Sequence, residues 1–288
     1  MKSRIADSCV CCDSKDFKKS PAILMPFVAQ RAFDWKPVEI NKSWGLKTIK
    51  NGMAYSICNS VLCSNCFHLF LDIRFSDDEM GRLYDHYRET AYINLREKYE
   101  PGYKTRNKKL NLGYQYLNEI ENFLRPFLRK SSAILDWGGD SGKNTPFQSA
   151  CDFLHIYDIS QRPVVGKAVR IEKNQTQNTK YDLIVCSHVL EHAPYPGDIL
   201  SDIRSAMNKN TVLYIEFPYE NLVRTTKNKN NLHRLKRHWH EHVNFFNERS
   251  AEELLSNSDL EILKLKKLLT SGESSEYVFQ IVCKLKNS

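Results

Sequence analysis

The chain has 288 residues and lacks any long uninterrupted run of apolar side chains. Nothing in it approaches the roughly 18 consecutive apolar residues that a membrane-spanning helix requires, and no apolar run follows the basic start MKSR. These absences argue against a membrane span and against a secretory signal, so we expect a cytoplasmic protein. Its 41% hydrophobic and 26% charged residues are ordinary for a globular chain that folds as one large or two modest domains.

An excess of acidic charge is also lacking, since the formal net charge is +8. Residues 1–130 carry 22 Lys and Arg against 15 Asp and Glu, whereas the remainder carries 20 against 19. A basic front half is compatible with a phosphorylated or nucleic-acid partner. A solvated basic surface explains the same counts, so charge alone does not choose between them.

Nine cysteines are present, an odd number in a chain without an export signal, which argues against a framework of disulfides. Two pairs have the spacing of zinc knuckles, Cys9-x-x-Cys12 and Cys63-x-x-Cys66. Two residues between thiolates let both bind one tetrahedral ion, and two such pairs complete a closed site of four cysteines. We therefore predict a structural Zn²⁺ ion held by these four cysteines.

Two features leave the set of metal ligands open. Cys11 and Cys58 are competing candidates, and buried free thiols are the alternative to a metal site. The two pairs are also separated by more than the roughly 15 to 20 residues of a compact zinc ribbon. The aromatic-rich stretch between them must therefore form a small β-structure or loop of its own.

A glycine-rich turn follows an apolar run in the stretch AILDWGGDSG, residues 133–142. The run ends in Asp136, and the glycines are Gly138, Gly139 and Gly142. This pattern predicts a buried strand that enters a tight turn before a helix. Glycine suits such a turn because a side chain would block close approach of a nucleotide and because tight turns often require positive φ. The same turn occurs in sheet proteins that bind no ligand, so the motif alone does not establish a site.

Two later apolar runs support the interpretation of that turn as a binding site. FLHIYD, residues 153–158, ends in Asp158 about twenty residues beyond the first strand, where a nucleotide-binding sheet places the carboxylate that holds ribose hydroxyls. YDLIVCSHVLEH, residues 181–192, gives a further buried strand and then a polar, histidine-rich segment. Together the three stretches predict one ligand crevice.

The order of LDWGG.SG, YD, YDLIVCSHVLEH and TVLYIEFP resembles the class I S-adenosylmethionine-dependent methyltransferases over residues 131–288. The resemblance implies an α/β fold with a Rossmann-like, seven-stranded sheet, and S-adenosylmethionine as cofactor. It also implies the residues that contact the cofactor, which are Asp136, Gly138, Gly139, Gly142, Asp158 and Ser187. One residue departs from the family pattern acid-x-Gly-x-Gly-x-Gly, because Asp140 stands at the middle glycine.

The segment LCSNCFHLFLDIRFSDDEMGRLYDHY adds a second resemblance, to methyltransferases with an N-terminal zinc-binding domain found among deoxysugar and surface-polysaccharide enzymes. In that group a Tyr-x-x-Tyr element lies near the substrate, which implies Tyr84 and Tyr87 as substrate contacts. The acceptor implied is a sugar or nucleotide-sugar, methylated on carbon or oxygen in surface-polysaccharide or secondary-metabolite biosynthesis. The alternative is that the two tyrosines only pack against a helix.

A proton acceptor is needed when the methylated atom is a hydroxyl oxygen or a carbon beside a carbonyl. His242, in HWHEHVNFF, has a side chain that ordinarily titrates near neutrality, and Glu241 could stabilise its charged form. In the zinc-containing sugar methyltransferases a Glu-His pair after the fifth strand supplies the base, which implies Glu241 and His242, and His192 matches a family histidine near the reacting sugar. Structural hydrogen bonding, or a metal site made by the histidines and acids, is the alternative.

Six basic residues and no acid lie between Asn221 and Trp239. We expect a mobile basic loop there, with Arg234 and Arg237 neutralising the diphosphate of a nucleotide-linked sugar. A solvated flexible loop without a ligand is the alternative.

Periodicity predicts the remaining elements. Apolar positions at every third or fourth residue predict one long helix over residues 104–128, and similar spacing predicts helices at 196–207 and from 251. Strands are expected at 169–171, 211–217, 260–268 and 277–282, and a polar loop at 174–180. The expected domains are a zinc-binding domain at 1–75, a helical connector at 76–130 and a methyltransferase domain at 131–288.

Two other functions fit parts of the sequence. An RNA methyltransferase would suit a zinc module and a basic front half. However, amino-methylating nucleic-acid enzymes commonly carry an Asn/Asp-Pro-Pro-aromatic element after the fourth strand, where this chain has Ser187-His188-Val189-Leu190. A non-catalytic binding protein that keeps the fold would explain Asp140. We therefore expect a small-molecule acceptor rather than a nucleic acid.

Overall fold

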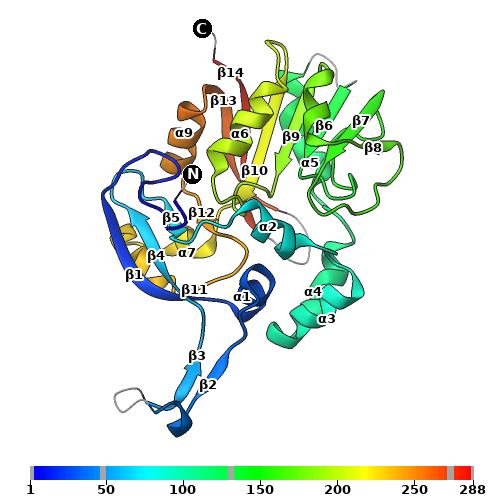
Figure 1. The fold of residues 1–288 in the computed structure, drawn as a ribbon. Coiled ribbons are helices and arrows are strands. Elements are labelled where there is room, and N and C mark those ends of the chain that lie inside the picture. Colours follow the sequence, from blue (N-terminus) through cyan, green and yellow to red (C-terminus); the bar gives the residue numbers. More distant parts are fainter. Residues whose placement is uncertain (1–2, 46–49, 129–132, 271–275, 287–288) are drawn as a thin grey trace.

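The computed structural model describes residues 3–45, 50–128, 133–270 and 276–286 (Figure 1). Its larger sheet has seven strands in the order β13-β14-β10-β9-β6-β7-β8. The strands are β6 (Ala133–Trp137), β7 (Phe153–Tyr157), β8 (Ala168–Arg170), β9 (Leu183–Ser187), β10 (Val212–Pro218), β13 (Leu260–Leu269) and β14 (Tyr277–Leu285). Neighbours from β10 to β8 pair in parallel, whereas β14 runs antiparallel to both β10 and β13. The predicted seven-stranded α/β sheet is confirmed.

Apolar runs explain why this sheet is parallel at its centre. Every residue of β6 and of β10 is buried, as are four of the five in β9. Strands buried on both faces require a helical layer on each side of the sheet. One layer contains α5 (Leu117–Leu124), and the other contains α6 (Pro196–Ser205) and α9 (Glu248–Asn257). Helix α9 begins earlier than predicted because Asn247 caps it through a hydrogen bond from Ser250 N–H.

A second sheet lies beside the first, with five strands in the order β11-β1-β4-β5-β12. Its strands are β1 (Phe17–Leu24), β4 (Ile57–Cys63), β5 (Leu69–Leu71), β11 (His238–Trp239) and β12 (Asn244–Phe245). Trp239 is fully buried there, and its Nε1 donates a hydrogen bond of 2.8 Å to Ser60 Oγ. Residues 238–245 therefore complete a sheet that the N-terminal part of the chain begins. The division into domains at 1–75, 76–130 and 131–288 stays a prediction.

A two-stranded hairpin, β2 (Val38–Ile40) and β3 (Gly52–Ala54), projects away from both larger sheets (Figure 1). The short 3₁₀ helix η1 (Lys42–Trp44) lies between its strands. The hairpin exposes large apolar side chains, among them Trp44 at 46% and Met53 at 49% exposure. The stretch between the two cysteine pairs thus contains β-structure of its own, as the sequence predicts.

Four further helices lie in the first half of the chain: α1 (Pro26–Phe33), α2 (Asp77–Tyr84), α3 (Thr90–Tyr99) and α4 (Tyr103–Leu110). The single long helix predicted over residues 104–128 is wrong, because α4 ends at Leu110 and α5 begins only at Leu117. Between them Gly113 has φ of +88°, in the left-handed region that a right-handed helix excludes. The apolar periodicity continues on both sides of this break, so it did not reveal the break.

Two segments predicted as loops have regular structure. The basic segment folds into α7 (Asn221–Thr225), η4 (Lys229–Asn231) and α8 (Leu232–Leu235), and Leu232 is fully buried. The polar stretch at 174–180 lies mostly in the 3₁₀ helix η3 (Lys173–Asn178). Short helices of three to six residues carry too little periodicity to predict. The described part of the chain contains no helix with the length and hydropathy that crossing a bilayer requires.

Candidate functional site

The turn after β6 is packed so closely that side chains would not fit at its glycines. A Cβ atom on Gly138 would lie 2.3 Å from Val189 Cγ2, and one on Gly139 would lie 2.5 Å from the carboxyl carbon of Asp136. Gly138 and Gly142 also have φ of +80°, which glycine adopts without strain. Packing therefore requires glycine at these positions, which leaves bare backbone there, as the predicted cofactor site requires.

Asp136 anchors this turn from inside the sheet. The residue is buried, and its Oδ2 accepts a hydrogen bond of 2.5 Å from Thr145 Oγ1. Burial raises the pKa of the Asp136 carboxyl to about 7. The hydrogen bond to Thr145 gives it a structural role, and its contact with the cofactor stays a prediction.

Asp158 follows β7 and joins two loops through its carboxylate. It accepts hydrogen bonds from the backbone N–H groups of Asp140, at 2.9 Å, and Ser160, at 2.7 Å. Arg170 reinforces the same contact by donating to the carbonyl oxygens of Asp158 and Asp140 at 3.2 and 2.9 Å. The carboxylate predicted to hold ribose hydroxyls thus borders the glycine-rich turn.

The two histidines predicted as catalytic lie together. The rings of His192 and His242 are nearly perpendicular, with centroids 4.6 Å apart. His242 Nδ1 lies 2.8 Å from Glu220 Oε1. His192 Nδ1 lies 2.9 Å from Tyr84 Oη and 3.1 Å from the carbonyl oxygen of Glu241. Segments far apart in sequence therefore meet in one histidine cluster, which we define as Tyr84, His192, Glu220 and His242.

The histidine cluster adjoins the glycine-rich turn. His192 ends the segment 188–192 after β9, and Val189 of that segment packs on Gly138. On the other side, Tyr84 ends α2, and Arg88 lies four residues further along the chain. Arg88 Nη1 lies 3.8 Å from Oδ2 of Asp140 in the turn. The turn and the cluster are thus connected on two sides.

The two histidines differ in their affinity for protons. Burial alone would lower the pKa of His242, but Glu220 and Glu191 raise it above its ordinary value. Burial and the charge of His242 lower the pKa of His192 to about 4. His192 is therefore neutral at pH 7, whereas His242 binds a proton readily, as a general base must.

Glu241 has a partner other than the one expected. Its Oε1 lies 2.6 Å from Nη2 of Arg96, and Nε of the same arginine lies 2.9 Å from Glu100 Oε2. The Arg96 side chain is 3% exposed. Although burial opposes ionisation, Arg96 and His242 hold the pKa of Glu241 far below its usual range. The carboxylate bonded to His242 is that of Glu220, which nothing in the sequence indicates.

A buried polar network around Glu216 was not predicted. Glu216 is fully buried in β10 and accepts hydrogen bonds from Tyr116 Oη at 2.7 Å and Tyr214 Oη at 2.6 Å. His188 lies between two carboxylates, with Nε2 3.3 Å from Glu216 Oε1 and Nδ1 3.2 Å from Glu191 Oε1. Burial alone would lower the pKa of His188, but its surroundings raise it well above the usual value. The one sequence feature that indicated this network was a glutamate inside the apolar run TVLYIEFP.

The remaining predicted contacts have different surroundings. The Tyr87 ring packs edge-on against the Tyr84 ring, with centroids 5.4 Å apart. Ser187 Oγ donates a hydrogen bond of 3.3 Å to Glu216 Oε1. Arg234 in α8 and Arg237 before β11 are exposed. The roles of these residues toward cofactor and substrate stay predictions.

The four predicted cysteine ligands converge. The Sγ atoms of Cys9 and Cys66 lie 3.6 Å apart, as do those of Cys12 and Cys63, and all four lie within 4.8 Å of one another. Sulfurs bound at about 2.3 Å to a tetrahedral ion lie about 3.8 Å from each other, so this donor set fits such an ion. Hydrogen bonds with neighbouring thiols also lower the pKa of Cys9, which favours a thiolate.

Of the two competing cysteines, Cys58 is not among the four clustered residues, whereas the Cys11 thiol neighbours the thiol of Cys9. Cys58 lies in β4 opposite Ala22, and burial raises the pKa of its thiol to about 12. Cys11 is buried, and its carbonyl accepts a hydrogen bond of 3.0 Å from Asn257. Within the described residues, neither thiol belongs to the set of four whose sulfurs all lie within 4.8 Å of one another.

A second group of side chains has a donor set that could hold a metal. Glu191, His192 and His242 each offer one ligand atom, and these atoms lie within 4.8 Å of one another. His192 Nε2 lies 4.0 Å from Glu191 Oε1. The metal alternative stated for the histidines and acids therefore stays open beside the general-base interpretation.

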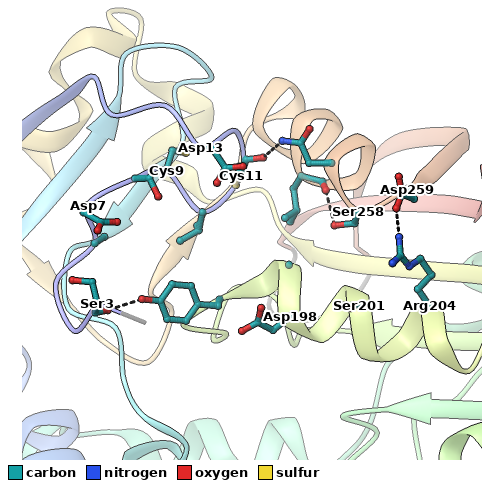
Figure 2. Close-up of a pocket in the computed structure, with 17 residues that line it drawn as sticks. Ser3, Asp7, Cys9, Cys11, Asp13, Asp198, Ser201, Arg204, Ser258 and Asp259 are labelled. Carbon is teal, nitrogen blue, oxygen red and sulfur yellow. Dashed lines mark hydrogen bonds and ion pairs between the residues drawn. The ribbon is translucent and has the colours of Figure 1, made fainter. Parts of the chain in front are cut away.

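A separate cavity of about 600 Å³ lies between the N-terminal segment and helices α6 and α9 (Figure 2). Its charged lining consists of Asp7, Asp13, Asp198, Arg204 and Asp259. No residue of the glycine-rich turn or of the histidine cluster lines it. The excess of acid does not suit a phosphorylated acceptor, so the strand ends of the seven-stranded sheet remain the candidate site.

Several known methyltransferases are similar to this chain. A tRNA U34 carboxymethyltransferase from Campylobacter jejuni is 25% identical over 116 residues, a match that covers 34% of this chain and only 40% of that protein. A 1,6-didemethyltoxoflavin-N1-methyltransferase from Burkholderia thailandensis, solved with bound S-adenosylhomocysteine, aligns at TM-score 0.47 and 12% identity over 67% of this chain and 88% of its own. Magnesium protoporphyrin IX methyltransferase from Synechocystis PCC 6803 aligns at 0.39 and 16% identity over 58% and 82%.

The sequence model of a methyltransferase-domain family matches residues 107–265. This match includes the glycine-rich turn, Asp158 and the segment that carries His192, and it extends into β13. Since it covers more than half of the chain, the protein belongs to this family and is an S-adenosylmethionine-dependent methyltransferase.

Proposed function

We propose that this methyltransferase acts on a hydroxyl oxygen or an acidic carbon of a sugar or nucleotide-sugar, in surface-polysaccharide or secondary-metabolite biosynthesis. The observation that supports this best is His242, which is paired with Glu220 and packs against His192, in the segment whose Val189 contacts the glycine-rich turn. Methylation of such an atom releases a proton, so a base must lie next to the cofactor. His242 is the side chain whose charge and placement suit that step.

Each residue of the candidate site then has a distinct role in methyl transfer. S-adenosylmethionine supplies an activated methyl group when bound, so what remains is alignment of the acceptor and removal of its proton. His242 takes the proton, and Glu220 stabilises the imidazolium that forms. Tyr84 and His192 are bonded to each other and line the approach to His242, where they orient the acceptor.

A sugar acceptor is supported by the tyrosines and by the basic segment. Tyr84 belongs to the histidine cluster and Tyr87 packs against it, and aromatic rings of this kind suit the apolar face of a sugar ring. Arg234 and Arg237 supply exposed positive charge for a diphosphate. We assign Zn²⁺ to the four-cysteine cluster as a structural ion that ties residues 9–12 to residues 63–66.

An RNA acceptor is the second candidate. The distant Campylobacter jejuni relative is a tRNA-modifying enzyme, although the similarity is 25% over less than half of either chain. The projecting hairpin and its connection expose Trp44, Lys42 and Lys50, the combination of ring and charge that single-stranded RNA binds. These features favour RNA over other macromolecules as the acceptor if no sugar is methylated.

The deciding experiment uses the purified, zinc-loaded chain with methyl-labelled S-adenosylmethionine. We would offer thymidine-diphosphate and guanosine-diphosphate sugars in one series and total tRNA in the other. Label in a nucleotide-sugar, with an apparent KM that Arg234→Glu and Arg237→Glu raise and the exposed control Arg125→Glu does not, supports the proposal. Label in tRNA alone would overturn it in favour of the second candidate.

A further inference from the structure

Asp140 has a charged side chain at the position where the family pattern has its middle glycine, in the turn that binds the cofactor. Its φ is +53°, a left-handed conformation that costs energy for any residue but glycine. Such a conformation persists when surrounding contacts hold it. The contacts around Asp140 therefore indicate what the carboxylate does there.

Two arginines lie close to the Asp140 carboxylate, at different distances. Arg162 Nη1 lies 2.5 Å from Asp140 Oδ2, within hydrogen-bonding distance. Arg88 Nη1 lies 3.8 Å from the same oxygen, too far for a hydrogen bond. Arg162 therefore fixes the carboxylate, whereas Arg88 only faces it.

Two polar atoms at this point have no hydrogen-bond partner although they are buried. They are Nε of Arg88 and Oδ1 of Asp140. The Arg88 side chain is 15% exposed and stacks over the Tyr87 ring at 4.8 Å, so its guanidinium is held in place. A buried donor and a buried acceptor without partners, on two side chains that approach to 3.8 Å, are costly unless a ligand completes them.

S-adenosylmethionine ends in a zwitterion, an ammonium and a carboxylate on one carbon. A site for that end needs a fixed anion beside a fixed cation, because each charge must be matched after water is removed. Asp140 and Arg88 are such a pair at the rim of the glycine-rich turn. We propose that the Asp140 carboxylate accepts hydrogen bonds from the α-ammonium of the cofactor and that Arg88 binds its α-carboxylate.

This assignment gives a function to the departure from the glycine pattern. Asp140 supplies through its side chain a contact that bare backbone cannot make, since a backbone N–H does not attract an ammonium. Arg88 lies in the segment after α2, four residues beyond Tyr84, the last residue of that helix. Cofactor binding therefore draws that segment onto the turn, next to His192.

A purely structural ion pair between the segment and the turn is the competing explanation. It predicts that substitutions weaken every ligand of the turn alike, because the turn itself would shift. The zwitterion assignment predicts instead that the loss depends on which charges the ligand carries. Ligands that share the adenosine part but differ in the tail distinguish the two.

The test measures binding by calorimetry, without any acceptor, for three ligands. S-adenosylhomocysteine has both tail charges, decarboxylated S-adenosylmethionine lacks the carboxylate, and methylthioadenosine lacks both. Arg88→Gln should weaken S-adenosylhomocysteine about 10- to 100-fold and leave the other two within about twofold. Asp140→Asn should weaken the two ligands that carry an ammonium and spare methylthioadenosine.

The exposed Arg125→Gln is the matched control and should change none of the three affinities. Retained methylthioadenosine binding shows that each variant is folded at the turn. Equal losses for all three ligands, or no loss for S-adenosylhomocysteine, would overturn the assignment. Because no acceptor is used, the outcome is independent of whether the acceptor is a sugar or RNA.

Discussion

His242 Nδ1 and Glu220 Oε1, 22 residues apart in sequence, lie 2.8 Å apart. A carboxylate only accepts hydrogen bonds, so Nδ1 carries the proton of this bond and Nε2 is left to accept one. The same contact raises the pKa of His242, although burial opposes the change. The pair thus fixes both the orientation and the basicity of the proposed base.

The pH dependence of the rate follows from this pair. A general base works when deprotonated, so kcat/KM should rise with pH through the pKa of His242, with a midpoint above the ordinary histidine value of about 6.5. Glu220→Gln removes the charge that stabilises the imidazolium and should move the midpoint to lower pH. His242→Ala should lower kcat about 100- to 10,000-fold. A midpoint that Glu220→Gln leaves unchanged would show that another group titrates.

Much of the fold could be predicted from the sequence, because strands buried on both faces appear as apolar runs. Strands β6, β7, β9 and β10 fall within one or two residues of the runs that predicted them. The four-cysteine cluster was equally predictable, since ligand spacing is a local property of a knuckle. The break between α4 and α5 was not, because one glycine at φ of +88° does not disturb the apolar spacing around it.

Residues of the candidate site could be predicted only where those that act together lie close together in the sequence. The glycines of the turn belong to one short segment, and the sequence shows them together. The partners of His242 and Glu241 lie elsewhere in the sequence, because Glu220 and Arg96 reach them only through tertiary packing. The local pattern therefore indicated the proposed base, His242, but paired it with the adjacent glutamate, which instead binds Arg96.

The buried pair of Arg96 and Glu241 should matter for stability. Arg96→Met would leave Glu241 and Glu100 without their cation and should lower the free energy of unfolding by about 3–5 kcal/mol. Arg4 offers a matched control, because its Nη2 lies 2.7 Å from Glu79 Oε1 while its side chain is 55% exposed. Arg4→Met should cost about 1 kcal/mol or less. Urea unfolding of both variants measures the difference, and equal losses would contradict the role given to burial.

Metal content tests the four-cysteine cluster. Cys63→Ser should lower zinc from one ion per chain to a substoichiometric amount and reduce thermal stability, because a closed site of four thiolates loses one ligand. Cys58→Ser is the control, since Cys58 lies in the same strand β4 and outside the cluster. Elemental analysis of the dialysed proteins measures both. Two metal ions per chain, reduced to one by His242→Ala, would instead show that Glu191, His192 and His242 hold a metal.

Close packing at the glycine-rich turn gives the last prediction. Gly138→Ala introduces a Cβ that would lie 2.3 Å from Val189 Cγ2, on a residue with φ of +80°. Gly102 isolates the second effect, because its φ is +97° and a Cβ there would meet no atom within 4 Å. Gly102→Ala should therefore cost about 1–2 kcal/mol of stability and leave S-adenosylhomocysteine binding unchanged.

Gly138→Ala should cost about 1–3 kcal/mol more through overpacking, and should weaken S-adenosylhomocysteine at least about tenfold, because relief of the clash moves either the turn or the segment that carries His192. Titration calorimetry and urea unfolding of Gly102→Ala and Gly138→Ala separate the effect of backbone strain from that of the clash with Val189. If both variants bind S-adenosylhomocysteine as the unsubstituted chain does, the approach of Val189 to Gly138 is not what shapes the cofactor site. The side of the site that includes His192 would then have to be positioned by Tyr84 instead.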